Sequence, residues 1–260
     1  MRGILQVITL IFLTVHVSGQ DCYIESKDML RNDFSGIWIG ETFQGTIGKN
    51  NQRIEIRFIS VSKVNDKTYS VIGKSKVNSN ICDFTGKILI QKSMKLDEKN
   101  LDCEDPDYSF GFLSGNYELN ENETQSHVGQ FLGDFRTMYD KTSTGFVVNS
   151  DWYGQEGVSE FIGEWKDYKK DTPKYCSWGI QIPPTKRNDL FKHYDNEFYI
   201  FNSKYIDNGW RTYVLAHQGS FIGVPKDFES DKTRQSEGFM TFDKQDIEES
   251  RKKEKIIWWK

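Results

Sequence analysis

The stretches FSGIW at residues 34–38 and FIGEW at residues 161–165 share one pattern: an aromatic residue, a glycine and a tryptophan at alternate positions. Alternate side chains of a β-strand lie on the same face. The pattern therefore predicts two strands whose aromatic side chains enter a core, with the glycine leaving room for a large neighbour. We expect Trp38 and Trp165 to be buried there.

Alternation of apolar and polar residues predicts further strands. In residues 53–58, Ile54, Ile56 and Phe58 alternate with charged residues. The other predicted strands cover residues 34–41, 68–72, 84–90, 115–119, 129–139, 145–149 and 161–168. About eight strands in roughly 150 residues form an antiparallel meander, which tends to close into a barrel because closure removes unpaired edges. The expected fold class is mainly β, with a mixed or helical C-terminal extension.

The N-terminus predicts a secretory signal peptide over residues 1–19. Arg2 precedes an apolar run at residues 4–17, and small residues follow at Ser18 and Gly19. A membrane anchor is the alternative, but the run is shorter than the roughly 20 residues that span a bilayer. We therefore expect an extracellular or periplasmic protein without a membrane span.

Two domains are predicted after the signal peptide. The β-barrel domain covers residues 20–182, and the paired prolines that follow cannot continue a strand ladder. The second domain, at residues 185–260, is an aromatic-rich α or α/β extension.

The extension contains two predicted helices. Aromatic residues from Phe191 to Tyr205 recur at spacings of three and four, which favours a helix. A strand over residues 196–202 is the alternative. A terminal helix is expected within residues 243–259, with Ile256, Ile257, Trp258 and Trp259 docked on the body of the protein.

Four cysteines remain after export, and an even count in an oxidising compartment predicts two disulfides. We favour Cys82 with Cys103 and Cys22 with Cys176, although the sequence permits three pairings. Zinc is the alternative, but no C-x-x-C pair or histidine cluster accompanies the cysteines. No metal or cofactor is predicted. Asn122 begins a glycosylation sequon that applies if the source is eukaryotic.

The charge distribution argues against nucleic-acid binding, because the net charge is −4 and acidic and basic residues are interleaved. The basic run at residues 251–253 is interpreted as a solvated helix face. No nucleophile elbow, phosphate loop or dinucleotide motif is present. Glu41 and Glu164 are candidates for a glycosidase pair, but outward-facing charges on half-buried strands are the simpler interpretation.

Gly36-Ile37-Trp38, in the expected first strand of the meander, resembles the Gly-x-Trp motif of lipocalin and calycin barrels. In those families this strand closes one end of the barrel, and the other end opens to a small, often apolar ligand. The resemblance covers residues 30–182. It implies a barrel with a cavity.

The sequence thus predicts a secreted or periplasmic protein that binds a small apolar, aromatic or sugar ligand. Trp152, Tyr153 and Trp178 lie near predicted strand ends and are the expected ligand contacts. Two alternatives are a secreted hydrolase acting on glycans and a protein-interaction module that uses the C-terminal aromatic segment.

Overall fold

The computed structural model describes residues 22–97, 99, 110–148, 158–170, 172–180, 183–184, 189–194, 198–217 and 243–260. The predicted signal peptide lies outside these residues and stays a prediction. No helix in the described ranges is long and apolar enough to cross a membrane.

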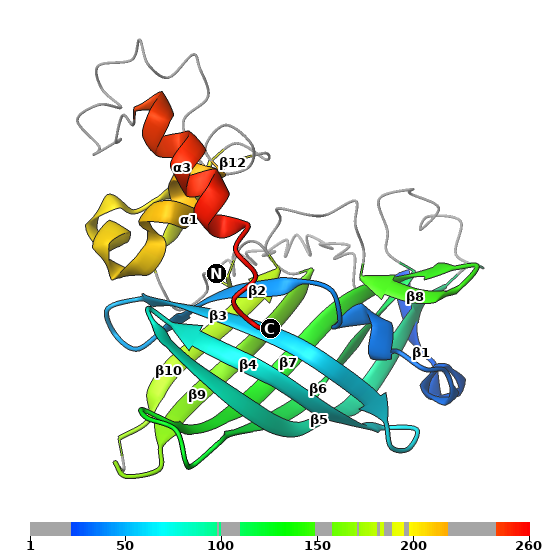
Figure 1. The fold of residues 1–260 in the computed structure, drawn as a ribbon. Helices are drawn as coiled ribbons and strands as arrows, with labels where there is room; N and C mark the ends of the chain where they lie inside the picture. Colours follow the sequence, from blue (N-terminus) through cyan, green and yellow to red (C-terminus); the bar gives the residue numbers. More distant parts are fainter. Residues whose placement is uncertain are drawn as a thin grey trace, which may run out of the picture.

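Eight antiparallel strands form a closed barrel, which confirms the predicted fold class (Figure 1). They are β2 (Thr42–Ile47), β3 (Gln52–Lys63), β4 (Thr68–Val77), β5 (Asn80–Leu96), β6 (Gly111–Glu121), β7 (Gly129–Thr142), β9 (Ser159–Asp167) and β10 (Lys174–Ile180). Each strand pairs with the next in this order, and β10 pairs with β2 to close the barrel. Two short strands, β1 (Tyr23–Glu25) and β8 (Gly145–Val148), pair with the ends of β5 and β7.

Aromatic side chains fill much of the barrel interior. Ile54 and Phe58 of β3 point inward and are at most 1% exposed, as the alternation predicts. Phe161 of β9 stacks against Trp178 and Phe135, with ring centroids 5.7 and 5.6 Å away. Interlocking rings of this kind leave no room for a ligand in this part of the barrel.

The segment at residues 34–41 is not the predicted strand, because it forms the short 3-10 helix η3 (Ser35–Ile37). The Asp33 carboxylate accepts hydrogen bonds from the Ser35 backbone N–H at 2.9 Å and from its hydroxyl at 2.6 Å, which stabilises a turn. Trp38 is nevertheless fully buried, as predicted, and its indole N–H donates to Thr137 Oγ1 at 3.2 Å. The stretch at residues 34–38 therefore closes one end of the barrel as a plug instead of as a strand.

Lys63, at the end of β3, fixes this plug in place. Its ammonium donates to the backbone carbonyls of Leu30, Arg31 and Asn32 at 2.8, 2.8 and 2.9 Å. These residues follow or end the 3-10 helix η2 (Lys27–Arg31), whose terminal carbonyls lack helical partners. In Figure 1 both short helices lie at the end of the barrel away from the C-terminal module.

The glycine of the stretch at residues 161–165 allows two backbones to approach closely. Gly163 of β9 lies opposite Gly133 of β7, and a Cβ atom on Gly163 would lie 2.0 Å from the Leu132 carbonyl oxygen. Only glycine fits there.

Residues 189–194, 198–217 and 243–260 form what we call the C-terminal module, with its own hydrophobic cluster around Trp210. Its elements are β11 (Phe191–Tyr194), β12 (Phe198–Phe201), η6 (Ser203–Tyr205), the π-helical turn η7 (Ile206–Trp210), α1 (Arg211–Ala216) and α3 (Lys244–Glu254). The helix predicted from the aromatic spacing is wrong: β11 and β12 form a hairpin that places Phe191 opposite Phe201, ring centroids 5.4 Å apart. The alternative strand and the terminal helix are confirmed.

The predicted disulfide pairings are wrong. Cys82 and Cys176 are free thiols buried in the barrel, on β5 and β10. Cys22 is disulfide-bonded, and Cys103 lies outside the described residues. Burial raises the pKa of the Cys82 thiol to about 11, which makes it a poor nucleophile.

Candidate functional site

A cavity of about 1140 Å³ lies at the end of the barrel opposite the Trp38 plug. Its walls come from the turns that connect β2 to β3, β4 to β5, β6 to β7 and β9 to β10, and from two residues of the C-terminal module. Ligand cavities commonly fall in the range of about 300–1000 Å³. The cavity can therefore hold a small organic molecule.

The deep side of the cavity is apolar. Phe131 of β7 and Trp165 of β9 line it and are 1% and 5% exposed. Phe131 also packs edge-on against Trp178, with ring centroids 5.4 Å apart, so it separates the cavity from the filled part of the barrel. Ile54 and Val77 complete this apolar surface.

One buried carboxylate, Glu121 at the end of β6, lies on the cavity wall at 5% exposure. It accepts hydrogen bonds from the Gly129 backbone N–H at 2.8 Å, from the Trp165 indole N–H at 3.0 Å and from the Ser75 hydroxyl. Burial raises its pKa above the ordinary 4.5, although the three hydrogen bonds act in the opposite direction. Glu121 thus orients Trp165 and fixes the β6–β7 loop.

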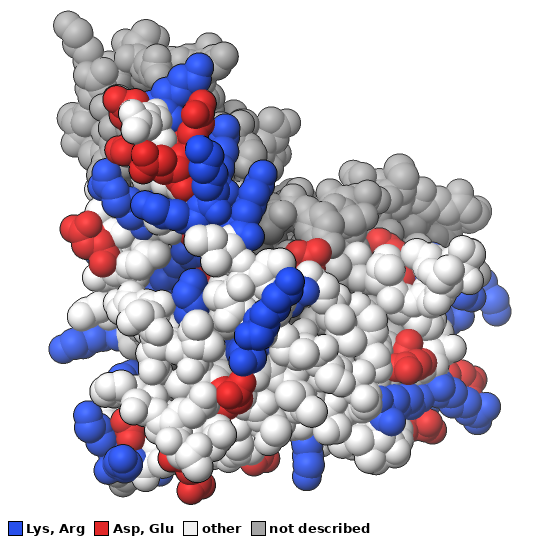
Figure 2. All heavy atoms as spheres, in the orientation of Figure 1, with Lys and Arg blue, Asp and Glu red and all other residues white. Residues whose placement is uncertain are grey.

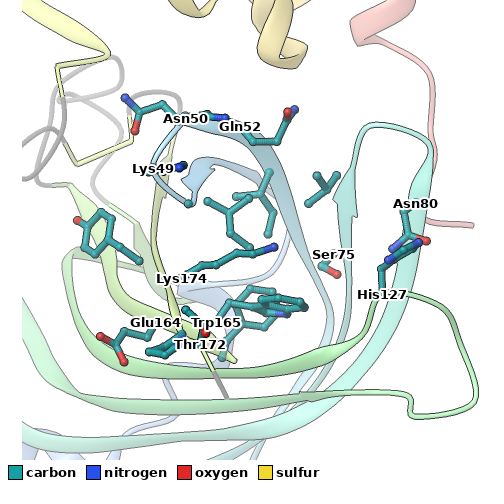
Figure 3. Close-up of a pocket in the computed structure, with 18 of the residues that line it drawn as sticks. Lys49, Asn50, Gln52, Ser75, Asn80, His127, Glu164, Trp165, Thr172 and Lys174 are labelled. Carbon is teal, nitrogen blue, oxygen red and sulfur yellow. The ribbon is translucent and has the colours of Figure 1, made fainter. Parts of the chain in front are cut away.

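Lys174 crosses the cavity above Trp165, as Figure 3 shows. Its ammonium lies 4.7 Å from the Trp165 ring centroid, within cation–π distance. Within the described residues no carboxylate forms an ion pair with it. Lys49 and the amides of Asn50, Gln52 and Asn80 line the rim (Figure 3), so hydrogen-bonding groups surround an apolar floor.

Replacing Glu121 tests this arrangement. In Glu121→Gln the amide oxygen can accept from Gly129 and Trp165 while the amide nitrogen donates to Ser75, so we expect the free energy of unfolding at pH 7 to stay unchanged or to rise slightly. Glu121→Ala leaves buried donors without an acceptor and should lower it by about 2–3 kcal/mol. Urea denaturation measures both.

The sign of the pH dependence follows from the raised pKa of Glu121. Its contribution to stability is complete below pH 4.5 and is lost as the pH rises through the folded-state pKa. Glu121→Gln should remove this loss. A Gln variant as unstable as the Ala variant would contradict the proposed hydrogen bonding.

The C-terminal module binds directly to the β2–β3 turn at the cavity rim. The Trp210 indole N–H donates to the Asn51 carbonyl at 2.8 Å, and Gln52 Nε2 donates to the Asn208 carbonyl at 2.7 Å. Gly209, with φ +86°, turns the chain at this contact. The sequence Asp-Asn-Gly is typical of a position where a helix ends. The module thereby fixes the position of one side of the cavity mouth.

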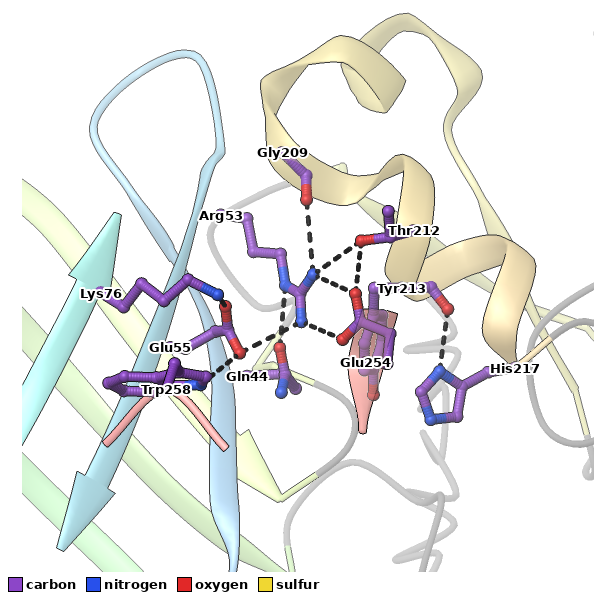
Figure 4. A network of polar contacts seen from close by, with 10 residues as sticks. All are labelled: Gln44, Arg53, Glu55, Lys76, Gly209, Thr212, Tyr213, His217, Glu254 and Trp258. Carbon is purple, nitrogen blue, oxygen red and sulfur yellow. Dashed lines mark hydrogen bonds and ion pairs between the residues drawn. The ribbon is translucent and has the colours of Figure 1, made fainter. Parts of the chain in front are cut away.

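A buried network around Arg53 secures this contact (Figure 4). Arg53 of β3 binds both carboxylate oxygens of Glu254, with Nη1–Oε1 and Nη2–Oε2 distances of 2.9 and 2.7 Å, and its Nε donates to Gln44 at 3.0 Å. Its guanidinium carbon lies 4.8 Å from the Tyr213 ring centroid. Glu55 lies 3.5 Å from Arg53 Nη2.

This network explains why charges on the outward face of β3 are buried. Burial tends to raise the pKa of Glu254, but the hydrogen bonds and charge of Arg53 outweigh it and lower the pKa below its ordinary value. Lys76 and the Trp258 indole N–H contact Glu55 at 2.7 and 3.1 Å. Trp258 therefore docks on the barrel, as predicted. The predicted docking of Ile256 and Ile257 is wrong, because they follow the end of α3 and are 62% and 47% exposed.

The structure separates the predicted ligand contacts. Trp152 and Tyr153 lie outside the described residues and stay predictions. Trp178 is fully buried in the aromatic core and does not line the cavity. Glu164 lies at the cavity edge, whereas Glu41 lies beside the C-terminal module. Asn122 is exposed in the β6–β7 loop, and its glycosylation stays a prediction.

Glu121, Ser75 and Lys174 are cavity residues that the sequence interpretation missed. One signal was available for Glu121: Tyr117 and Leu119 point inward from the predicted strand at residues 115–119, and the same alternation continues inward at position 121. Nothing comparable marks Lys174, which is the first residue of β10.

Comparisons of this chain with protein-family models, curated proteins and solved structures find no match. The closed eight-stranded antiparallel barrel is consistent with a calycin-like barrel. Within the described residues, no group of three or more His, Cys, Asp and Glu side chains is placed to hold a metal ion.

Proposed function

We propose that this protein is a secreted or periplasmic lipocalin- or calycin-like barrel that binds a small molecule in the cavity at its open end. The observation that carries the proposal is the contrast between the two halves of the barrel. Aromatic rings fill the half near Trp38, while about 1140 Å³ stays open beyond Phe131. A protein that needed only a stable core would gain by filling this space too.

The lining favours a ligand with a planar apolar part and polar groups at its edge. Trp165 and Phe131 offer aromatic surface, and Trp165 is held by its hydrogen bond to Glu121. The Lys174 side chain covers the Trp165 face, so it can move aside for a ring or contact a ligand acceptor. The amide-rich rim supplies donors and acceptors for the polar groups.

Export is part of the proposal and has separate support. The apolar run at residues 4–17 has the length of a signal peptide. The disulfide at Cys22 suits an oxidising compartment.

The binding test uses N-phenyl-1-naphthylamine, a neutral planar probe whose fluorescence rises in apolar sites. We expect saturable binding to the wild type, with sugars and fatty acids tested as competitors. Val77→Phe fills part of the cavity and should weaken probe binding about tenfold or more. Val64→Phe is the matched control, because Val64 is 63% exposed in the turn near the closed end. Equal binding by Val77→Phe and the wild type would place the probe outside this cavity.

A further inference from the structure

A second hollow, of about 480 Å³, lies where the C-terminal module meets the outside of β2 and β3. We call it the junction hollow. The lining residues that matter for binding are Glu41, Arg57, His217, Arg251, Lys255 and Trp259. It is distinct from the barrel cavity, which shares none of these residues.

Cations dominate the junction hollow. Arg57 comes from the barrel, and Arg251 and Lys255 come from the end of α3. Of its two carboxylates, Glu254 is already bound at both oxygens by Arg53, which leaves Glu41 to balance the three cations. Figure 2 shows Lys and Arg side chains gathered over this end of α3, next to the barrel.

Backbone carbonyls accept hydrogen bonds from two of these three cations. Arg251 Nε donates to the Ala216 carbonyl at 3.2 Å, at the C-terminal end of α1. Arg57 donates to the Gly40 carbonyl. Burial lowers its pKa, although the charge of Glu41 acts in the opposite direction. The Lys255 ammonium has neither an ion pair nor a hydrogen bond within the described part of the chain.

Aromatic groups stand beside these cations. The Arg57 guanidinium carbon lies 4.5 Å from the Trp259 ring centroid, and the Tyr213 and His217 rings are 4.2 Å apart. Burial lowers the pKa of His217, so at neutral pH it contributes an uncharged ring. Its Nδ1 lies 2.8 Å from the Tyr213 carbonyl oxygen, which fixes its orientation.

We propose that the junction hollow binds a small organic dianion, such as a phosphate monoester with an aromatic body. Arg57, Arg251 and Lys255 would contact the anionic group, because guanidinium and ammonium groups form strong charge-assisted hydrogen bonds with phosphate oxygens. Trp259 would contact the aromatic body. Such a ligand bridges the barrel and α3 and relieves repulsion between cations that the fold brings together. This site does not depend on the proposed function of the barrel cavity.

The test compares phenyl phosphate, inorganic phosphate and neutral phenol by calorimetry at low ionic strength, with the full mature chain. We expect saturable binding with one site for phenyl phosphate, weaker binding for inorganic phosphate and none for phenol. Lys255→Gln should weaken phenyl phosphate binding about five- to tenfold, the scale of one charge-assisted contact. Lys92→Gln, which removes an exposed lysine of β5, is the matched control and should bind like the wild type.

Two further measurements separate the possible failures. The Arg251→Gln/Lys255→Gln variant should lose binding while it still binds the neutral naphthylamine probe in the barrel cavity. If this variant binds neither phenyl phosphate nor the naphthylamine probe, it has a folding defect. The single variant Lys255→Gln then tests the proposal. Binding of phenyl phosphate that is equal in the wild type and Lys255→Gln, or no saturable binding at about 10 mM, would overturn the proposal.

Discussion

Glu254→Gln is expected to lower the free energy of unfolding by about 3 kcal/mol, because it leaves the Arg53 guanidinium buried without its principal counter-ion. The side chains of Arg53 and Glu254 are 7% and 16% exposed, so solvent screens the pair little. Glu55, 3.5 Å from Arg53, offsets part of the loss, which places the estimate at the lower end for buried pairs. Urea denaturation followed by tryptophan fluorescence reports on Trp210 and Trp258 at the interface.

Glu248→Gln is the matched control, since it removes the same charge from an exposed position of α3 and should change stability by less than about 0.5 kcal/mol. Replacing both partners, as in Arg53→Met/Glu254→Leu, should recover most of the loss, because two apolar side chains leave no buried charge. If Glu254→Gln matched the Glu248→Gln control, the ion pair would not be what docks the C-terminal module.

The Arg53–Glu254 pair also predicts that the free energy of unfolding falls at acidic pH. The folded-state pKa of Glu254 lies below its ordinary 4.5, so its stabilisation is complete above that pH. It is lost as the pH falls through the folded-state pKa. In Glu254→Gln the free energy of unfolding should depend less on pH in this range, which a series of urea titrations between about pH 3 and pH 7 would show.

Trp38→Ala is expected to lower the free energy of unfolding by about 3–5 kcal/mol, the range for removal of a large buried aromatic side chain. Trp38 is fully buried and packs edge-on against Tyr69 and Phe135, with ring centroids 5.3 and 5.7 Å away. Its removal also leaves the Thr137 hydroxyl without the indole donor. Denaturant titration measures the loss.

Trp165→Ala provides the comparison for this prediction. Trp165 borders the open cavity, so its removal enlarges a space that already exists, and we expect a smaller loss, about 2 kcal/mol. Trp38→Phe keeps an aromatic plug and should also lose less than Trp38→Ala. Equal losses for Trp38→Ala and Trp165→Ala would mean that the two ends of the barrel do not differ in packing.

The barrel could be predicted because strand alternation is a local signal. Ile54, Ile56 and Phe58 show their inward face in six consecutive residues. The same signal misled at residues 34–38, where aromatic spacing looked like a strand. The turn formed by Asp33 and Ser35 competes with extended structure there, and an aspartate two residues before a serine was the available sign.

The aromatic spacing at residues 191–205 gave a wrong prediction because a helix and a β-hairpin can both bring these side chains together. Positions 191 and 201 fit a helical stripe, yet in the hairpin they are cross-strand partners. The predicted disulfide pairings are wrong because the number of cysteines does not show which way their side chains point. Cys82 lies two residues from Phe84, and Cys176 two residues from Trp178, so both thiols lie on the inward faces of their strands.

Apart from the strand alternation that extends to Glu121, nothing in the sequence locates the cavity, and nothing locates the junction hollow. The cavity depends on four turns that are far apart in the chain, and the hollow depends on β3 meeting α3. Arg53 and Glu254 are two more examples, because each looks like an ordinary surface charge until the fold pairs them.

Strand β3 carries the attachment of both ends of the chain. Lys63, its last residue, binds the carbonyls around η2, and Arg53, its second residue, binds the C-terminal module. In amide hydrogen exchange, the β3 amides paired with β2 and β4 should therefore belong to the slowest class, exchanging only on global unfolding. The N-terminal plug and the C-terminal module are held to the barrel mainly by side-chain contacts and not by its strand ladder, so each should exchange through its own, faster opening. A protease would accordingly remove either end before it cut the barrel.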